Sequence, residues 1–460
     1  MDSGDVVSGI HKEIDMKKIF VLYLIAIFIG AVTLHACSDD DKTVQITGLK
    51  MNYQSVSLKQ GDHLQLTAIP RPADAPVSVK WTSSDPTIAS VDDRGNVTAI
   101  NDCGRAVITA RVGSYFCKCT VTLISSTPQD FASALGSVDL EKIIYSRDVQ
   151  LPATRRIMQG FDIAKSGKMY YSQISAGAGT STYVSMATGP GEMAEQKYMD
   201  CRYFGHGTQI VAEEAADGKT YIWLNSNGNM ETGGEYGTNL SVSRVEFVPG
   251  AVHESYAGRT FFLNKNGEYD QQVSIDFEHR RLLIGSRKSA RYFWIFDLDE
   301  VLALPEKDMK ITTNVEGVTS EKTVRGCDLN DCRVLGHFTV NGGSNKETDV
   351  YSYSHQGHAI YGDYVYFYEG NAITLGTDNF TCKAYVTVFD YSGNIAVPRT
   401  EVKVLSATDA WKSLGLTTTG WCEPEGLKVD ADGIYLGVAS RDGDSSPRRA
   451  NILFYRSSNP

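Results

Sequence analysis

The chain has 460 residues, with 44 Lys and Arg against 55 Asp and Glu, which gives a formal net charge of −11 at pH 7. This length exceeds what one hydrophobic core usually supports, so two or three domains are expected. The negative charge argues against nucleic acid or an anionic lipid surface as a partner. The 42 Gly and 24 Tyr residues, together with a scarcity of helical patterns, favour short strands and tight turns, so the expected fold class is all-β.

The N-terminal segment, residues 1–37, has the layout of a secretory signal. Two lysines precede an apolar run from Ile19 to Leu34, and Cys37 follows shortly after it. The run of about 16 residues is shorter than the roughly 20 that a helix needs to cross a bilayer, so a membrane span is the less favoured alternative. The tetrapeptide that ends at Cys37 resembles the bacterial lipobox, which implies cleavage before Cys37 and a lipid on its thiol.

The residues on either side of this segment refine the predicted location. Residues 1–15 are rich in acidic side chains that do not suit a signal, so Met16 is the expected start of the protein. The acidic stretch Ser38–Asp41 resembles the export tag of surface lipoproteins in the Bacteroidetes, although it could equally be a solvated leader. We therefore expect an outer-membrane protein that is exposed at the cell surface and touches the membrane only through its lipid at Cys37.

Cysteine usage fits that compartment without fixing any pairing. With Cys37 set aside, three cysteines fall in residues 38–125 and five in residues 126–460. Both counts are odd, so at least two thiols stay free unless a disulfide joins the two domains. No Cys-x-x-Cys pair occurs, and we expect neither a zinc site nor a cofactor.

Residues 38–125 alternate between apolar and polar side chains along seven short segments, the pattern of an immunoglobulin-like β-sandwich. The stretches Trp81–Asp85, Ile88–Asp92, Gly95–Ala99 and Gly104–Ala110 resemble the group 2 bacterial Ig-like domains. In that family such domains serve as spacers or adhesive modules, and a spacer is expected here. The Trp81 ring is expected to pack between the two sheets.

Residues 126–460 contain five copies of a repeat of about 67 residues. Each copy begins with a head, which is a small or apolar residue, a polar residue and usually Gly, and continues into two further strands. The ends of the region together supply one repeat, as a ring sealed by its first and last strands would need. We predict a five-bladed β-propeller, with six blades as the alternative. The heads are Met158–Ile163, Gly205–Ile210, Gln271–Asp276, His355–Ile360 and Pro424–Val429.

These heads resemble the propeller of phage receptor-binding and teichoic-acid-type wall proteins, a group that includes helveticin-like bacteriocins. The resemblance implies binding to cell-wall glycopolymers and transfers no catalytic residue. It rests on Gln159-Gly160, on Gly205–Gln209 with Tyr221–Trp223, on His355–Gly357 with Tyr364–Tyr366, and on Glu425–Leu427 with Ile434–Leu436.

The heads predict a polar ring at one mouth of the central channel, because the first strand of each blade borders that channel. Amides and imidazoles in such a ring would bond sugar hydroxyls, and the following Gly would allow close approach of backbones. Alternatively, the ring only satisfies backbone groups and ordered water. The predicted ligand-binding residues are Gln159, His206, Gln209, Gln272, Gln356, His358 and Glu425.

Chemistry beyond binding has weaker support in the sequence. A metal held by His206, His358 and Glu425 lacks a recognisable ligand spacing, so none is expected. A glycosidase needs two carboxylates, and of Asp162, Asp276, Glu423 and Glu425 only the last occupies a ring position. Trp411 and Trp421 are candidate stacking platforms for sugar rings.

The predicted function is non-catalytic recognition of an extracellular glycan or cell-wall polymer at the channel mouth. The first alternative is a carbohydrate-active hydrolase or lyase that uses Glu425 with His206 or His358. The second is an adhesion or scaffold protein whose ring is purely structural.

Overall fold

The computed structural model describes residues 45–457 except 102–103, 124–126, 176–180, 227–240, 266, 316–317, 377–378, 414–421 and 442–446. The predicted signal, the lipidation at Cys37 and the candidate platform Trp421 lie outside these residues. Among the described residues, no helix has the length and apolar character that crossing a membrane requires.

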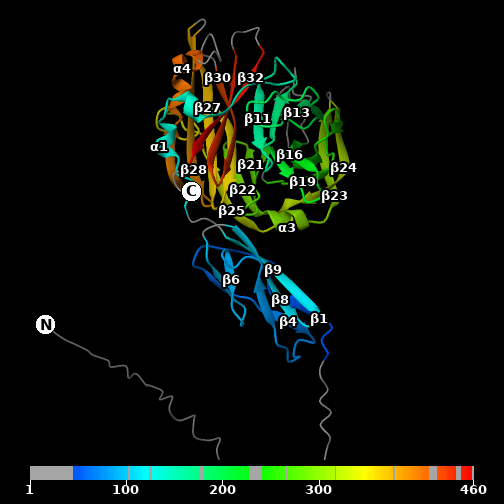
Figure 1. The fold of residues 1–460 in the computed structure, drawn as a ribbon. Coiled ribbons are helices and arrows are strands. Elements are labelled where there is room, and N and C mark those ends of the chain that lie inside the picture. Colours follow the sequence, from blue (N-terminus) through cyan, green and yellow to red (C-terminus); the bar gives the residue numbers. More distant parts are fainter. Residues whose placement is uncertain are drawn as a thin grey trace, which may run out of the picture. The chain divides into compact units, whose positions relative to one another are not determined.

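The first domain is a small β-sandwich of nine short strands (Figure 1). Its three sheets have the strand orders β1-β4, β2-β9-β8-β5 and β3-β7-β6, and its apolar cluster includes Leu66, Val97 and Ile108, which are fully buried. The strands are β1 (Gly48–Met51), β2 (Ser55–Leu58), β3 (His63–Gln65), β4 (Ala68–Arg71), β5 (Lys80–Ser83), β6 (Ala89–Val91), β7 (Asn96–Ala99), β8 (Gly104–Val112) and β9 (Tyr115–Leu123).

The prediction of seven strands in this domain was short by two, because it did not include β1 and it read β3 and β4 as one strand. Residues 64–68 look like one alternating strand, yet the chain changes sheets there: β3 pairs with β7, and β4 pairs with β1. Leu66, between the two strands, bonds instead to the Gly95 carbonyl. The Trp81 ring packs against the apolar cluster and over Gly95, but it remains partly exposed.

The second domain contains five antiparallel sheets that resemble propeller blades. We number them by their first strands, and a short parallel strand or hairpin extends sheets one and two. Sheet one has β11 (Met158–Ile163), β12 (Met169–Ile174), β13 (Ser181–Ala187), β14 (Met199–Arg202) and β18 (Val252–Glu254); sheet two has β15 (Ile210–Glu214), β16 (Thr220–Ser226), β17 (Ser241–Glu246), β19 (Arg259–Phe262), β23 (Lys307–Val315) and β24 (Val318–Asp328). Sheet three has β20 (Tyr269–Asp276), β21 (Arg281–Arg287), β22 (Arg291–Asp297) and β25 (Val334–Val340); sheet four has β26 (His355–Tyr361), β27 (Tyr364–Gly376), β28 (Asn379–Asp390) and β29 (Ile395–Glu401); sheet five has β30 (Cys422–Asp430), β31 (Gly433–Ser440), β32 (Arg449–Arg456) and β10 (Ile144–Gln150).

The sheets are arranged around the five first strands. β11 contacts β15, β15 contacts β20, β20 contacts β26, β26 contacts β30, and β30 contacts β11. A separate apolar cluster fills each space between neighbouring sheets, for example Tyr170 and Ile222 between sheets one and two, and Leu283 and Val365 between sheets three and four. Burial of these apolar faces is the main stabilising term expected for such layers.

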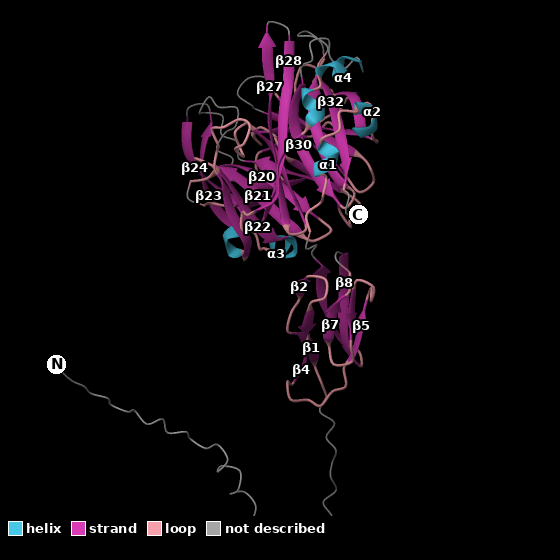
Figure 2. Cartoon of the chain, turned by 90° about the vertical axis from the view of Figure 1, so that its left-hand side faces the viewer, coloured by secondary structure: helices cyan, strands magenta, loops and turns pink. Residues whose placement is uncertain are grey.

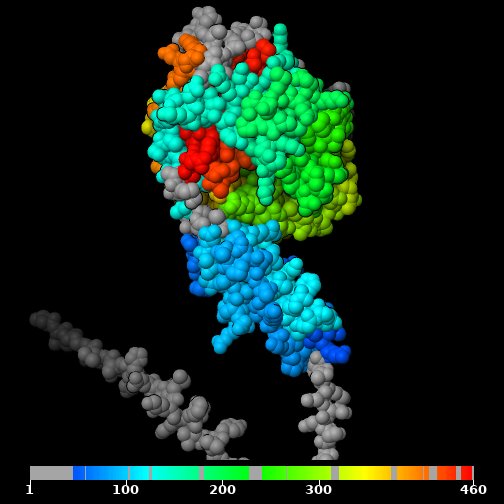
Figure 3. Space-filling view, viewed as in Figure 1, coloured from blue at the N-terminus to red at the C-terminus, as the bar shows by residue number. Residues whose placement is uncertain are grey.

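One sheet joins the two ends of the domain. β10 pairs antiparallel with β32, with Ile144 opposite Leu453 and Gln150 opposite Arg449. The space-filling view shows the C-terminal residues in red beside the cyan start of the domain (Figure 3). This pairing is the closure that the sequence predicted.

Helices are short and lie outside the sheets (Figure 2). Leu135 and Leu140, in the first two of them, join the apolar cluster between sheets four and five. The helices are α1 (Ala132–Leu135), α2 (Leu140–Ile143), α3 (Leu298–Ala303) and α4 (Thr408–Ser413), with single 3-10 turns η2 (Leu329–Asp331) and η3 (Lys403–Ser406).

Candidate functional site at one end of the channel

One cavity of about 480 Å³ gathers a polar residue from the head of each of the five sheets. Four of these residues come from β11, β20, β26 and β30, and the fifth precedes β15. The structure therefore brings together positions that are far apart in the chain. These five residues, called the head ring below, are Gln159, His206, Gln272, Gln356 and Glu425.

In three of the heads the ring residue lies inside a β-bulge of the first strand, and in a fourth, β20, a shift between Tyr269 and Gln272 ends at the ring residue. The strand register shifts between Met158 and Gly160 in β11, between His355 and Gly357 in β26, and between Pro424 and Leu427 in β30. A bulge leaves a residue out of the pairing and re-aims its side chain, which is why bulges gather at functional sites. Gln159, Gln356 and Glu425 lie within these shifts.

The glycines of the heads allow the first strands to approach one another. A Cβ atom at Gly160 would lie 2.8 Å from the Thr208 carbonyl oxygen, and one at Gly357 would lie 3.0 Å from the Leu427 nitrogen. Gly426 has a φ of +87°, which L side chains rarely adopt, and its Cβ would lie 3.1 Å from the Gly160 Cα. A Cβ at Gly207, in the second head, would lie 2.6 Å from the Thr182 Cγ2, so the sequence motif has a packing cause at four of the five heads.

The third head has Val273 where the others have Gly, and the structure makes room differently. Gly285, on the neighbouring strand β21, faces the His358 ring, and a Cβ there would lie 2.4 Å from the His358 Cε1. A glycine on the second strand thus replaces the glycine that the head lacks.

Gln209 and His358, predicted as ligand-binding residues, are not among the residues that line the cavity. The Gln209 side chain is buried, and its Nε2 donates to the Leu427 carbonyl at 3.2 Å. His358 is fully buried, its Nδ1 lies 3.2 Å from the His355 Nε2, and its ring meets Phe293 edge-on. Burial, with Arg291 nearby, lowers the pKa of His358 to about 3, so this imidazole stays neutral.

The amides of the head ring differ in how many of their hydrogen-bonding atoms already have a partner in the protein. The Gln356 Nε2 donates to the Gly370 carbonyl at 3.0 Å, and the Gln159 Nε2 lies 3.5 Å from the Met158 carbonyl. These bonds agree with the structural interpretation of the ring. In contrast, the Gln272 Oε1 is buried and has no hydrogen-bond partner among the described residues. An unsatisfied buried acceptor is costly, and Gln272 is therefore the amide of the head ring whose hydrogen bonding is incomplete.

Two carboxyl groups, those of Glu423 and Glu425, also line the cavity. Burial raises the pKa of Glu425 well above its usual range, and the neighbouring Glu423 carboxylate raises it further. Burial also raises the pKa of Glu423, while Arg448 opposes that rise. A carboxyl group that holds its proton near neutral pH can donate a hydrogen bond or act as an acid.

The raised pKa of Glu425 makes a prediction about stability. Because its folded-state pKa lies above that of an unfolded glutamate, ionisation opposes folding as the pH rises past the unfolded value of about 4.3. Glu425→Gln should therefore raise Tm near pH 8 and leave it unchanged near pH 4, with about 2–4 °C for each kcal/mol gained. Scanning calorimetry across this pH range provides the check.

Glu141→Gln, a change at an exposed position in α2, is the matched control and should leave Tm unchanged throughout. If Glu425→Gln did not raise Tm near pH 8, the inference that burial disfavours the charged form of Glu425 would be contradicted.

Sequence reasoning missed the arginines of this cavity, Arg155, Arg156, Arg287, Arg291 and Arg448. Antiparallel pairing explains why Arg287, Arg291 and Arg448 gather here, because the end of a second strand and the start of a third lie level with the start of the first; Arg155 and Arg156 lie in the segment that leads into β11. In sheet three, Tyr269 of β20 lies opposite Arg287, and Arg287 lies opposite Arg291. Basic residues in the turns between second and third strands were the signal that could have revealed them.

The other ends of the first strands border a second cavity of about 780 Å³, in which the charged groups of the first strands pair with each other. Asp162 accepts from the Lys428 Nζ at 2.6 Å and the Ala212 nitrogen at 2.7 Å. Asp276 lies 2.7 Å from the His279 Nδ1 and accepts from the Gly362 nitrogen at 2.8 Å. These two glycosidase candidates therefore link first strands and lie away from the head ring.

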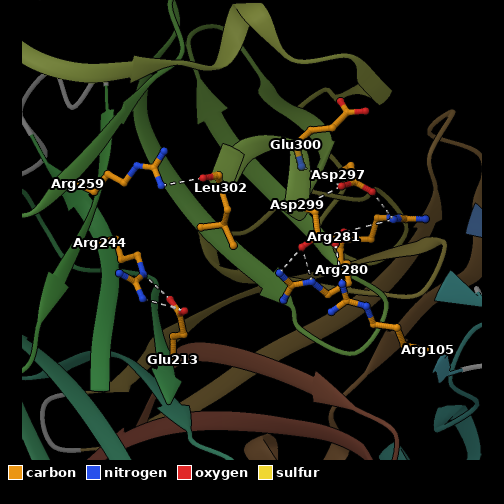
Figure 4. Close-up of polar contacts among 10 residues, drawn as sticks. All are labelled: Arg105, Glu213, Arg244, Arg259, Arg280, Arg281, Asp297, Asp299, Glu300 and Leu302. Atoms are coloured by element: carbon orange, nitrogen blue, oxygen red, sulfur yellow. Dashed lines mark hydrogen bonds and ion pairs between the residues drawn. The ribbon is translucent and has the colours of Figure 1, made fainter. Parts of the chain in front are cut away.

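Arginine pairs reinforce the same end of the domain (Figure 4). The Arg244 Nε donates to Glu213 at 2.6 Å, and the guanidinium stacks 3.5 Å from the Tyr221 ring centroid. Arg259 donates to the Leu302 carbonyl at 2.9 Å. Guanidinium groups here are held by acceptors of the chain itself, which favours a structural role.

Trp411 is not a stacking platform. It is fully buried in the cluster between sheets four and five, and its Nε1 donates to the Val404 carbonyl at 3.2 Å. Within the described residues, no group of three or more His, Cys, Asp or Glu side chains is arranged to hold a metal ion.

Comparison with known proteins identifies the first domain. Residues 45–122 match the bacterial Ig-like domain (group 2), so this part of the chain belongs to that family. An uncharacterized protein of Clostridium acetobutylicum is 41% identical over 98 residues, which is 19% of this chain and 10% of that protein. A 3-O-alpha-D-galactosyl-alpha-L-arabinofuranosidase of Bifidobacterium longum subsp. longum is 30% identical over 114 residues, 23% of this chain and 10% of that one. The chain thus spans about a tenth of these relatives.

Two solved structures overlap more of the chain at low identity. The tail fiber of a Staphylococcus aureus phage aligns with a TM-score of 0.43 and 13% identity, over 69% of this chain and 54% of that one. A GH43 protein of Bacillus licheniformis aligns with a TM-score of 0.31 and 9% identity, over 67% of this chain and 56% of that one.

Proposed function

We propose that the second domain is a five-bladed propeller and that its head ring recognises an extracellular glycan without cleaving it. The observation that carries the proposal is the convergence of five polar side chains, one from each sheet, on one cavity of about 480 Å³. That volume is within the range of small-ligand sites. A ring assembled from every sheet suits a ligand that is polar on all sides.

The chemistry of the lining supports a sugar as this ligand. Amides, imidazoles and carboxyl groups both donate and accept hydrogen bonds, as sugar hydroxyls require. The buried Gln272 Oε1 is an acceptor without a partner among the described residues. The raised pKa of Glu425 favours its protonated form, which can donate a hydrogen bond to a ligand. One relative is named as a galactosyl-arabinofuranosidase, and contact with glycans is the part of that name we extend to this chain.

The cellular setting completes the proposal. We place the protein at the outer membrane, anchored by lipid at Cys37, with the Ig-like domain as a spacer between membrane and propeller. The glycan, free or part of a cell wall, would be met outside the cell. The net charge of −11 disfavours nucleic acid as a competing partner.

A glycan array tests this proposal with the purified full-length chain and a His206→Ala/Glu425→Ala double variant. We expect binding by the wild type that the double variant loses by roughly a hundredfold or more, the sum of two lost hydrogen-bonding groups. His63→Ala/Glu141→Ala makes the same changes outside the cavity and should bind like the wild type. A folded wild type that binds no glycan would contradict recognition and favour the scaffold alternative.

A carbohydrate-active enzyme is the second candidate, and the raised pKa of Glu425 is the observation that favours it. A protonated carboxyl group is what a glycosidase uses as its acid, and His206 lines the same cavity. Glu425→Gln would then abolish product formation while binding persists. Product release from array-positive glycans, followed by mass spectrometry, separates this candidate from recognition.

A further inference from the structure

The cavity of the head ring has a basic wall in a chain that is acidic overall. Five guanidinium groups line it, against the two carboxyl groups of Glu423 and Glu425, whose charged forms are disfavoured by burial. The chain as a whole carries a net charge of −11. A local excess of positive charge therefore needs its own explanation. The arginine wall, as we call it, consists of Arg155, Arg156, Arg287, Arg291 and Arg448.

Arg291 is the most deeply buried member of the wall. Its side chain is 7% exposed, yet its Nε and Nη1 have no hydrogen-bond partner among the described residues. The nearest acid, Asp270, lies 3.6 Å from the Nη1, beyond hydrogen-bonding distance. Buried guanidinium groups are ordinarily satisfied by acceptors, as Arg244 is by Glu213.

Asp270 cannot neutralise its surroundings alone. The same Oδ2 atom faces the Arg287 Nε at 3.3 Å, the Arg291 Nη1 at 3.6 Å and the Gln272 Nε2 at 3.3 Å. One carboxylate oxygen is thus shared between two guanidinium groups, and it leaves the Arg291 Nε and Nη1 without a hydrogen bond among the described residues. An uncompensated buried charge is costly unless a counter-charge joins it.

The neighbouring histidine does not supply that counter-charge, and it does not add to the positive charge either. Burial first, and then Arg291 and His358, lower the pKa of His355 well below its usual range, so the ring stays neutral. Its Nδ1 has no hydrogen-bond partner among the described residues, and His355 lines the cavity. Arg291, His355 and Gln272 all line this cavity, and each has a buried polar atom without a hydrogen-bond partner among the described residues.

We propose that the arginine wall binds an oxyanion substituent of the glycan, a carboxylate, sulfate or phosphate ester, with Arg291 as its principal contact. The inference rests on the proposed function, because it names the class of glycan that the head ring takes. Guanidinium groups bond such oxyanions through charge-assisted hydrogen bonds, which are stronger than bonds to neutral hydroxyls. The head ring then contacts the sugar hydroxyls while the wall selects acidic glycans over neutral ones.

Calorimetric titration of the full-length chain with four trisaccharides tests the proposal. The probes are galacturonic acid, sulfated galactose, phosphorylated mannose and neutral galactose trisaccharides. We expect at least one acidic probe to bind on the order of tenfold or more tighter than the neutral one, and its affinity to fall as salt rises. The acidic probe that binds identifies the oxyanion.

Variants locate the binding. Arg291→Gln should weaken the acidic probe by roughly tenfold to a hundredfold and leave the neutral one unchanged. Because Arg291 is buried beside Asp270, the double variant Arg155→Gln/Arg156→Gln, in the partly exposed segment before β11, provides a second test that spares the interior. Arg325→Gln, at a position whose side chain is 63% exposed, is the control and should bind like the wild type.

The outcomes distinguish failure of the arginine-wall proposal from failure of glycan recognition itself. Two results would overturn the proposed role of the arginine wall while leaving glycan recognition intact. In the first, neutral glycans bind as tightly as acidic ones. In the second, neither the Arg291 variant nor the Arg155/Arg156 variant weakens binding of the acidic probe. A chain that binds none of the four probes and none of the arrayed glycans would overturn both.

Discussion

Replacing Glu369 with alanine is expected to lower the free energy of unfolding by about 3–5 kcal/mol, the range for breaking a buried ion pair. Glu369 lies on β27 and is fully buried. Its carboxylate accepts from the Arg399 Nε at 2.8 Å, the Tyr351 nitrogen at 3.0 Å and the Tyr353 nitrogen at 2.9 Å. The variant leaves the Arg399 Nε and two backbone donors without their acceptor, and it removes the counter-charge of a nearly buried guanidinium.

The same change should reach the candidate site, because Tyr351 and Ser354 line its cavity. Guanidinium chloride unfolding measures the stability, and probe titration measures the site. Glu347→Ala removes an exposed carboxylate that pairs with Lys383 at the surface, so it should cost no more than about 1 kcal/mol. Equal effects of the two substitutions would show that burial of the Glu369 pair carries no special weight.

Gly437→Ala is expected to destabilise the second domain by about 3 kcal/mol or more, or to prevent its folding. A Cβ atom at Gly437, on β31, would lie 1.8 Å from the Glu425 carbonyl oxygen and 3.0 Å from the Phe161 Cδ1. The obstacle is backbone, so no side-chain rotation relieves it. The bulge that carries Glu425 into the head ring depends on the missing side chain.

Gly189→Ala is the matched control for this substitution. Nothing lies within 4 Å of a Cβ built at Gly189, and its φ is not in the left-handed region, so its stability should change by less than about 1 kcal/mol. Both variants are compared by denaturant unfolding. A Gly437 variant as stable as the wild type would mean that the bulge yields to a methyl group and does not need the glycine.

The sequence predicted those features that each repeat carries within itself. The head glycines, the aromatic second strands and the polar position before each glycine recur at similar spacing, so their convergence follows once the sheets surround a channel. Tyr170, Trp223 and Tyr366 are buried between sheets, as second-strand aromatics are expected to be.

What the sequence could not supply depends on registers and on segments far apart in the chain. The bulges at Gln159 and Gln356 shift the alternation of side chains, so parity arguments along a regular strand fail there. The sequence predicted His358 as a member of the ligand site, but its ring packs against Gly285 of the third sheet. The arginine wall comes from the segment before β11, from the end of β21 and the start of β22, and from the segment before β32, and no local pattern unites these places.

The pairing of β10 with β32 has a consequence for how the domain is made. The strand that closes sheet five, β32, is synthesised after every other described strand of the domain, and its partner β10 is synthesised before them. A sheet shared by the two ends has the largest loop to close, and such contacts form slowly. Until that strand arrives, the Ile144–Gln150 edge has no partner. Sheet five can therefore be completed only after β32 has been synthesised.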